Sequence, residues 1–337
     1  MLTMIRKLML ATVSLLLCTP AAFAIDVTRP DVADWIRSVS REHGLDAGEL
    51  RKTLAAAEVK QSILDAIARP AEKAKPWSDY RAIFITPDRV AAGVEFWREH
   101  EPRLQRIAQK TGVPAEMLAG IVGVETYFGQ RAGKYRLVDA LVTLGFDYPP
   151  RAPFFRNELT QLFLLAREEK LSLDTAVGSY AGAMGAPQFI PSSYRNFAVD
   201  GDGDGRRDLF TSWDDVLASV ANYFVAHKWQ SGEAVTTRAF LTTPRALDPA
   251  ANQLKPDTTV VDLGTNGVRF MTDRPEAAAA GLMAFDGADG REHWIGFDNF
   301  YVITRYNRST MYALAVYQLG QAIGEAVRNQ APRIATP

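Results

Sequence analysis

Apolar residues at helical spacing run through the first two thirds of this 337-residue sequence, and this periodicity most constrains the fold. Within residues 31–40, Val32, Trp35, Ile36 and Val39 recur at steps of three and four, which is the signature of an amphipathic helix. Other helices are expected after an N-cap and first-turn proline at 86–87, after the proline at 114, and within 155–166, 212–227 and 309–327. We therefore expect a mainly α-helical protein.

The segment from about residue 233 to 305 has a different texture. Short runs rich in β-branched and aromatic residues are separated there by Pro, Gly and Asn, as in a small β-rich unit. The runs expected to form strands are 235–241, 258–263, 267–272, 281–286 and 301–304. The fold class is thus α+β, mainly α, and the length suits about two domains of roughly 150 residues.

The first 24 residues have the pattern of a secretory signal peptide. A basic pair at 6–7 precedes an apolar stretch over 8–17, and a small-x-small cleavage site ends at Ala24. Cys18, the only cysteine, admits the alternative of an outer-membrane lipoprotein, but the bulky Leu17 before it makes a poor lipidation site. We expect cleavage after Ala24 and a periplasmic location, with the other boundaries at 25–110, 111–230, 231–305 and 306–337.

Charge and cysteine content exclude several classes of function. The net charge is −1, so the sequence lacks the basic surface expected of a protein that binds nucleic acid. No apolar run approaches the roughly 18 residues of a transmembrane helix. Once Cys18 is removed, disulfides and cysteine catalysis are excluded as well. ATP or NAD chemistry is not expected outside the cytoplasm.

One carboxylate lies on the apolar face of an expected helix. Leu118, Ile121 and Val122 stand at positions i, i+3 and i+4, and Glu125 is i+7. A carboxylate on that face loses hydration, which raises its pKa and favours the protonated form that a general acid for glycosidic cleavage needs. The alternative is a helix-terminal glutamate that turns to solvent or pairs with Lys134. Spacing alone leaves both interpretations open.

Residues 179–194 combine small side chains, one thioether, several aromatic rings and isolated amide and hydroxyl groups. Such a mixture suits a sugar-binding groove, where apolar faces stack on sugars and a few polar groups fix their orientation. The alternative is a tight helix–helix crossing made possible by glycine and alanine. Composition does not separate the two.

Four motifs follow one another along the chain: GVET at 123–126, the 179–194 segment, SVANYF at 219–224 and NFYVITRYN at 299–307. Together they resemble the lytic murein transglycosylase B family, and the resemblance extends over about residues 30–327. It implies a lysozyme-like catalytic core within 111–230, an additional α-helical domain, a small β-rich subdomain, and a C-terminal helix that closes the groove. The implied substrate is peptidoglycan, with cell-wall synthesis or divisome proteins as candidate partners.

The resemblance also implies a mechanism in which Glu125 is the sole catalytic acid/base. Glu125 would protonate the oxygen between MurNAc and GlcNAc, and the MurNAc C6 hydroxyl would attack C1 to leave a 1,6-anhydroMurNAc end. Ordinary glycosidases use a pair of carboxylates instead. The alternatives are a hydrolytic muramidase with the same acid and a non-catalytic peptidoglycan-binding scaffold. The implied groove residues are Tyr80, Ser179, Met184, Gln188, Phe189, Tyr223, Tyr306, Asn307 and Tyr312.

Residues 200–205 read Asp-Gly-Asp-Gly-Asp-Gly, the opening of an EF-hand loop. Oxygens at alternate positions converge on a hard cation, and glycine at position six makes the sharp turn. Position twelve, usually a bidentate glutamate, is Thr211, and in the resembling family a later carboxylate, matched here by Asp215, takes its place. The alternative is a solvated turn. The spacing favours a structural calcium ion and no organic cofactor. The expected ligands are Asp200, Asp202, Asp204, Arg206 and Asp215, with Asp208 as an additional candidate.

Overall fold

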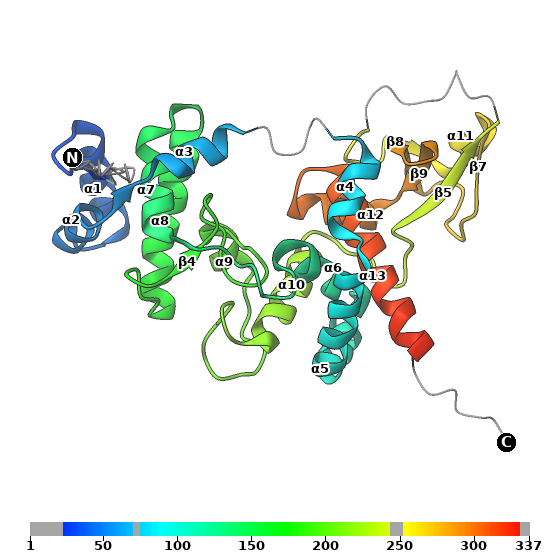
Figure 1. Cartoon of the computed structure of the whole chain (residues 1–337), viewed down its shortest axis with the longest axis horizontal. Coiled ribbons are helices and arrows are strands. Elements are labelled where there is room, and N and C mark those ends of the chain that lie inside the picture. The colour runs from blue at the N-terminus through cyan, green and yellow to red at the C-terminus, as the bar shows by residue number, and fades with distance from the viewer. Residues whose placement is uncertain (1–22, 70–74, 243–251, 331–337) are drawn as a thin grey trace, which may run out of the picture.

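The computed structural model describes residues 23–69, 75–242 and 252–330 (Figure 1). The described chain is mainly helical with one small β-sheet, which confirms the expected fold class. Its elements form three groups along the long axis of the molecule (Figure 1). One helical group lies at the N-terminal end, a second lies in the centre, and the sheet lies at the far end.

The N-terminal group joins helices from two parts of the chain. The first helix buries Val32, Trp35, Ile36 and Val39, as its periodicity predicts. Two later helices, α7 and α8, pack against each other, and α7 also contacts α3. A short antiparallel pair, β1 (Phe23–Ala24) with β2 (Glu58–Val59), completes the group. The helices are α1 (Pro30–His43), α2 (Ala47–Ala55), α3 (Gln61–Ala68), η1 (Pro149–Arg151), α7 (Leu137–Asp147) and α8 (Ala152–Glu169).

The central group is built around two helices that cross closely. A Cβ atom on Gly120 of α6 would lie 2.5 Å from the Val316 carbonyl oxygen, and one on Gly320 of α13 would lie 2.2 Å from the Glu116 carbonyl oxygen. Only glycine allows this contact. The predicted cap at Thr86 is confirmed, because its side chain accepts a hydrogen bond from the Arg89 N–H. The helices are α4 (Trp77–Phe84), α5 (Pro87–Thr111), α6 (Ala115–Thr126), α9 (Pro191–Phe197), α10 (Trp213–Ala226) and α13 (Thr310–Gln330).

The expected β-rich subdomain is present as a five-stranded antiparallel sheet in the order β6-β8-β9-β5-β7. It has a small core of its own, to which Leu263, Ile295 and Phe297 contribute. A second antiparallel pair, β3 (Tyr135–Arg136) with β4 (Val177–Gly178), lies outside this sheet. The elements of the subdomain are β5 (Thr236–Leu241), β6 (Thr258–Thr259), α11 (Val260–Thr265), β7 (Val268–Phe270), β8 (Ala279–Gly287), β9 (Gly290–Gly296) and α12 (Asp298–Tyr306).

Three details of the β-rich segment differ from the prediction. Residues 301–304 are helical within α12, where Phe300, Ile303 and Thr304 are buried at helical spacing, so packing overrides the β-propensity of these residues. Residues 258–263 are mostly the helix α11. Strand β9 was not predicted, because its charged residues are untypical of a strand. Its two-residue connection to β8, followed by Gly290 at φ 111°, is nevertheless typical of a β-hairpin.

Cys18 and residues 1–22 of the expected signal peptide lie outside the described residues, which begin at Phe23. Among the helices that the structure describes, none combines the length and the apolar character needed to cross a bilayer.

Candidate active site

Glu125 lies in the last turn of α6, the helix predicted to begin after Pro114. The residues before it on this helix are nearly all buried, and Glu125 itself is partly buried. The helix ends with Tyr127 and Phe128, both in the left-handed region at φ 51° and 58°. Residues other than glycine rarely adopt this backbone conformation. Backbone strain of this kind is concentrated at functional sites.

Two side chains fix the end of this helix. The Tyr312 hydroxyl donates a hydrogen bond of 2.5 Å to Oε1 of Glu125. The Thr126 hydroxyl donates to the Ala186 carbonyl oxygen at 2.9 Å and accepts from the Gly129 N–H at 2.9 Å. Glu125 is therefore oriented by a partner from α13, and its helix is tied to the 179–189 segment.

The phenol groups around Glu125 are held in the neutral form. Burial raises the pKa of the Tyr312 phenol well above its usual value, and the nearby Glu125 carboxylate raises it further. Burial likewise raises the pKa of Tyr306, to which Glu125 adds. Tyr80 also lies close to Tyr312. The Tyr306 and Tyr312 phenols therefore stay protonated near neutral pH and cannot serve as bases, and Tyr312 uses its proton to donate to Glu125.

The 179–189 segment folds into a compact loop after β4. The Ser179 N–H donates to the Ala183 carbonyl oxygen at 2.8 Å, and the Ser179 hydroxyl accepts from the Ala181 and Ala183 N–H groups. Gln188 adopts φ 52° and donates to the carbonyl oxygens of Ala132 at 3.1 Å and Gly185 at 2.9 Å. Polar side chains of this loop thus hold its own backbone. The tight helix–helix crossing considered from the composition is not what the segment forms.

An aromatic cluster joins this loop to two helices. Phe189 lies 5.6 Å from Tyr223 of α10 and 5.7 Å from Tyr306 of α12, measured between ring centroids. The Tyr223 hydroxyl donates to the Arg305 carbonyl oxygen at 2.6 Å, and the Tyr306 hydroxyl donates to the Pro187 carbonyl oxygen at 2.6 Å. Burial raises the pKa of Tyr223 to about 12. Three segments far apart in the sequence therefore meet next to Glu125.

The expected groove residues fall into two classes by exposure. Tyr80 and Met184 are only 1% and 0% exposed, so they lie in the protein interior. Phe189, Tyr223 and Tyr312 are buried as well. The residues with accessible surface are Ser179, Gln188, Tyr306 and Asn307, of which Asn307 is the most exposed. The sequence motifs do not distinguish the buried members of this predicted set from the exposed ones.

Arg89 is a feature of this region that the sequence analysis missed. It lies on α5, is 7% exposed, and its guanidinium stacks over Phe84 at 5.2 Å and Tyr127 at 5.0 Å. Within the described residues, its Nε and Nη1 atoms have no hydrogen-bond partner. Arg131 stacks on the same Tyr127 ring at 4.7 Å. The sequence spacing could have indicated this burial. Arg89 stands four residues before the buried Gly93 on the same face of α5, just as Glu125 lies on the apolar face of α6.

The acidic loop is a separate, exposed cluster. Carboxylate oxygens of Asp200, Asp202 and Asp204 all lie within 4.8 Å of one another. Oxygens bound to one calcium ion lie at about 2.3–2.6 Å from it, so two of them can be at most about 5 Å apart. The three aspartates therefore fit a hard cation such as calcium.

The other predicted ligands are placed differently. Asp215 is buried, and its two carboxylate oxygens accept from the Gly201 N–H at 2.7 Å and the Asp208 N–H at 2.6 Å. Asp208 in turn accepts from the Phe210 and Thr211 N–H groups. These two carboxylates brace the loop from within, outside the cluster of three. The Arg206 N–H donates to Asp204 at 2.8 Å.

Comparisons with known proteins cover nearly the whole chain. Residues 28–321 match the family described as "Transglycosylase SLT domain". Membrane-bound lytic murein transglycosylase B of Escherichia coli (strain K12) is 41% identical over 308 residues, which cover 88% of this chain and 83% of that protein.

Solved structures agree with this match. Lytic transglycosylase SltB1 from Pseudomonas aeruginosa aligns with a TM-score of 0.85 at 46% identity, covering 88% of this chain and 98% of that chain. E. coli Slt35 in complex with calcium aligns at 0.81 with 39% identity, covering 91% and 97%. P. aeruginosa SltB3 in complex with NAG-anhNAM-pentapeptide aligns at 0.77 with 26% identity, covering 86% and 78%. The lysozyme-like fold is confirmed. This chain belongs to the lytic murein transglycosylase B family.

Proposed function

We propose that this protein cleaves the glycan strands of peptidoglycan as a lytic transglycosylase, with Glu125 as its catalytic acid/base. The observation that carries the residue assignment is the partly buried Glu125 carboxylate, held by the Tyr312 hydroxyl at 2.5 Å and faced by Tyr306. Membership of the family supports the activity. A pure binding protein has no use for an acid placed in this way.

The geometry suits a group that first gives and then takes a proton. Glu125 protonates the glycosidic oxygen as the bond to MurNAc C1 breaks, and the N-acetyl carbonyl of MurNAc stabilises the positive charge at C1. Tyr312 donates to the carboxylate that forms, and a charge-assisted hydrogen bond of this kind is stronger than a neutral one. Glu125 then accepts the proton of the C6 hydroxyl as that oxygen attacks C1.

Capture by the C6 hydroxyl is favoured over capture by water for two reasons. Glu125 is the only carboxylate among the candidate catalytic and groove residues, whereas glycosidases of the common types use two. The C6 hydroxyl also belongs to the same sugar, so its effective concentration at C1 is high. The SltB3 relative is known in complex with NAG-anhNAM-pentapeptide, which contains an anhydro sugar. A hydrolytic muramidase remains the second candidate.

The products distinguish the two reactions. Purified protein is incubated with isolated sacculi, and the released muropeptides are analysed by mass spectrometry with and without borohydride. We expect fragments that are one water lighter than the hydrolysis products and that borohydride does not reduce. Predominantly reducible fragments would replace the transglycosylase with a muramidase.

The glycan contacts of this proposal follow from exposure. Ser179, Gln188, Tyr306 and Asn307 present accessible surface and would contact the sugars. The buried rings of Tyr80, Phe189, Tyr223 and Tyr312 and the Met184 side chain would keep these residues in place. Truncation of a surface residue should therefore raise KM, whereas truncation of a wall residue should also lower stability.

We infer that the acidic loop holds one structural calcium ion. Asp200, Asp202 and Asp204 supply the clustered carboxylate oxygens. Arg206, at position seven, would supply its backbone carbonyl oxygen, and Asp215 stabilises the loop through its hydrogen bond from the Gly201 N–H. The Slt35 relative is known in complex with calcium. The loop lies outside the cluster around Glu125, which supports a structural role over a catalytic one.

We also propose that the chain acts in the periplasm after export. The signal pattern of residues 1–24 supports this location, and the E. coli relative is named as membrane-bound. Lipidation at Cys18 and cleavage after Ala24 give mature chains of different mass. Intact-mass measurement of the protein purified from the cell envelope decides between them: cleavage after Ala24 is expected, and an acylated N-terminal cysteine would contradict it.

A further inference from the structure

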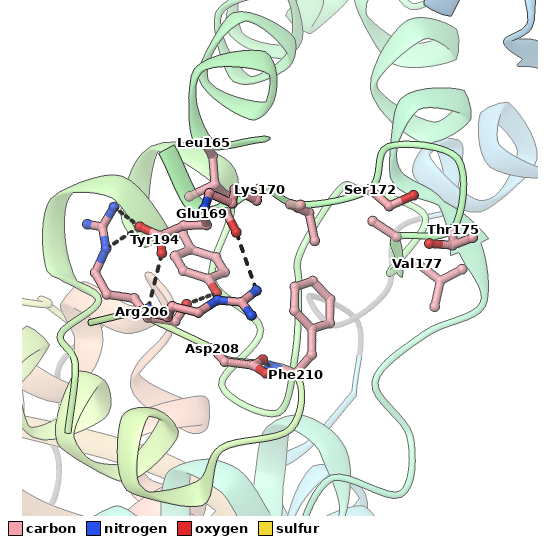
Figure 2. Close-up of a pocket in the computed structure, with 13 residues that line it drawn as sticks. Leu165, Glu169, Lys170, Ser172, Thr175, Val177, Tyr194, Arg206, Asp208 and Phe210 are labelled. Carbon is pink, nitrogen blue, oxygen red and sulfur yellow. Dashed lines mark hydrogen bonds and ion pairs between the residues drawn. The ribbon is translucent and has the colours of Figure 1, made fainter. Parts of the chain in front are cut away.

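A pocket of about 330 Å³ lies apart from the cluster around Glu125, between the C-terminal end of α8 and the loop that follows the acidic loop (Figure 2). Glu169 and Lys170 approach it from α8, Asp208 and Phe210 from the loop, and Val177 from β4 (Figure 2). This volume is in the range of small-ligand pockets, roughly 300–1,000 Å³. We call it the α8 pocket.

The pocket has more positive than negative charge to offer a ligand. Its acids are already engaged: Glu169 accepts from Arg207 at 2.6 Å, and Asp208 accepts from N–H groups of its own loop. Within residues 23–69, 75–242 and 252–330, neither Lys170 nor Arg206 has a carboxylate within ion-pair distance. The Arg206 guanidinium contacts the Glu169 carbonyl oxygen at 3.5 Å and so lies at the end of α8. Two cations are therefore available to an anionic group.

One wall of the pocket is apolar. Val177 is 43% exposed although its chain neighbours Ala176 and Gly178 are buried, and the partly buried Phe210 and Leu171 also line the cavity. An apolar wall beside two cations suits a short peptide with small aliphatic side chains and a free carboxylate. It suits a neutral sugar or an inorganic ion less well.

Both walls of the pocket lead to the 179–189 loop. Val177 lies two residues before Ser179, a separation of about 7 Å along an extended chain. On the other side, Leu209, next to Phe210, accepts a hydrogen bond from the Ala186 N–H at 3.1 Å. A pentapeptide extends up to about 17 Å. A peptide attached to a sugar beside Ser179 can therefore reach the pocket.

We propose that the α8 pocket binds the peptide stem that peptidoglycan carries on MurNAc. Lys170 and Arg206 hold a free carboxylate of the stem, and Val177 and Phe210 contact its aliphatic side chains. This proposal rests on the proposed function, because it assumes that the glycan lies beside Ser179. The pocket then selects strands by their peptide, while Glu125 acts on the sugar.

The test removes one cation without disturbing the backbone. Lys170 adopts the left-handed conformation at φ 54°, which asparagine tolerates, so Lys170→Asn removes the ammonium group without straining the backbone. Lys228→Asn is the matched control, because Lys228 is exposed, also left-handed at φ 74°, and follows a different helix. Rates are measured on glycan strands with peptide stems and on strands from which an amidase has removed the stems.

We expect Lys170→Asn to raise KM for stem-bearing strands about three- to fivefold, as for loss of an exposed ion pair, with kcat unchanged. KM for stripped strands should stay at the wild-type value, and Lys228→Asn should match wild type on both. Lys170→Glu should give a larger increase on stem-bearing strands. Free pentapeptide should inhibit the wild-type protein on these strands and inhibit Lys170→Asn less.

Three results would overturn the assignment. The first is an equal rise of KM on both substrates, and the second is no rise with either substitution. The third is a lower melting temperature with KM unchanged, which would make Lys170 a cap for the C-terminal end of α8 only. Failure of the wild-type protein to cleave either substrate is a separate outcome, and it would overturn the proposed function itself.

Discussion

The acidic loop and the active site hold their polar groups in opposite ways. In the loop, Asp200 accepts from the N–H groups of Gly203 and Gly205, within five residues along the chain. At the candidate active site, the Glu125 carboxylate accepts a hydrogen bond from Tyr312, which is 187 residues away in sequence. Local spacing is therefore enough to specify the loop, whereas only the folded chain assembles the active site.

The two regions also differ in local strain. The left-handed positions of the loop, Gly203 and Gly205, are glycines, for which this conformation has no steric penalty. Around the candidate active site, residues other than glycine also adopt the left-handed conformation, namely Tyr127, Phe128 and Gln188. Strain of this kind costs on the order of 1–3 kcal/mol for each residue. The strained residues beside Glu125 therefore lower the stability of the fold, and their backbone geometry sets the end of the helix that carries Glu125.

Glu125→Gln should have the largest effect on activity. The amide keeps the shape of the side chain but cannot transfer the proton, and loss of general acid–base catalysis costs about 10²–10⁴ in rate. Glu116→Gln is the control, because Glu116 lies on the same helix and pairs with Arg328 at 2.9 Å. Turnover on sacculi is measured for both. More than a tenth of wild-type turnover in Glu125→Gln would remove Glu125 from the mechanism.

Tyr312→Phe should have the next largest effect. It deletes the hydrogen bond to Glu125, and a bond to a charged group contributes about 1.5–3 kcal/mol, which corresponds to about 10- to 100-fold in kcat. Tyr317→Phe, on the same helix, should stay within about twofold of wild type. If the two substitutions give equal kcat values, the Tyr312 hydroxyl has no part in the reaction.

This contrast explains what the sequence could predict. Local periodicity predicts six of the helices (α1, α5, α6, α8, α10 and α13), the loop spacing and the position of Glu125 on an apolar stripe. The resemblance to the family, and not periodicity, placed Tyr306 and Tyr312 in the predicted groove. The helical state of residues 301–304 was missed, because their β-propensity is opposed by burial of Phe300 and Ile303 against distant elements. Exposure of the groove residues could not be predicted either, since it depends on which segments cover them.

Calcium should act on stability more than on catalysis. An ion that binds only the folded state at about 100 times its Kd adds about 2.7 kcal/mol to the free energy of unfolding. We expect a rise in melting temperature with calcium that chelation reverses and that Asp202→Ala abolishes. Asp273→Ala, at an exposed aspartate outside the loop, should retain the rise. A melting temperature insensitive to calcium in the wild-type protein would reduce the loop to a surface turn.

Arg89→Met should give the smallest of these changes, and it should increase stability. Within the described residues, Nε and Nη1 of this buried guanidinium are unpaired, and burial of an unpaired charge is unfavourable. We expect the free energy of unfolding in urea to rise by about 1 kcal/mol or more. Arg131→Met, at an exposed arginine on the same Tyr127 ring, should change it by less than about 0.5 kcal/mol. A destabilised Arg89→Met protein would show that the stacking outweighs the burial.

The central claim is that Glu125 cleaves the glycan without adding water. The most direct measurement is to digest sacculi with the wild-type protein in water labelled with heavy oxygen and to analyse the new MurNAc ends by mass spectrometry. Attack by the C6 hydroxyl places no solvent oxygen at C1, so we predict anhydro ends without label. Heavy oxygen at C1 of the newly formed ends would contradict the account and identify water as the nucleophile.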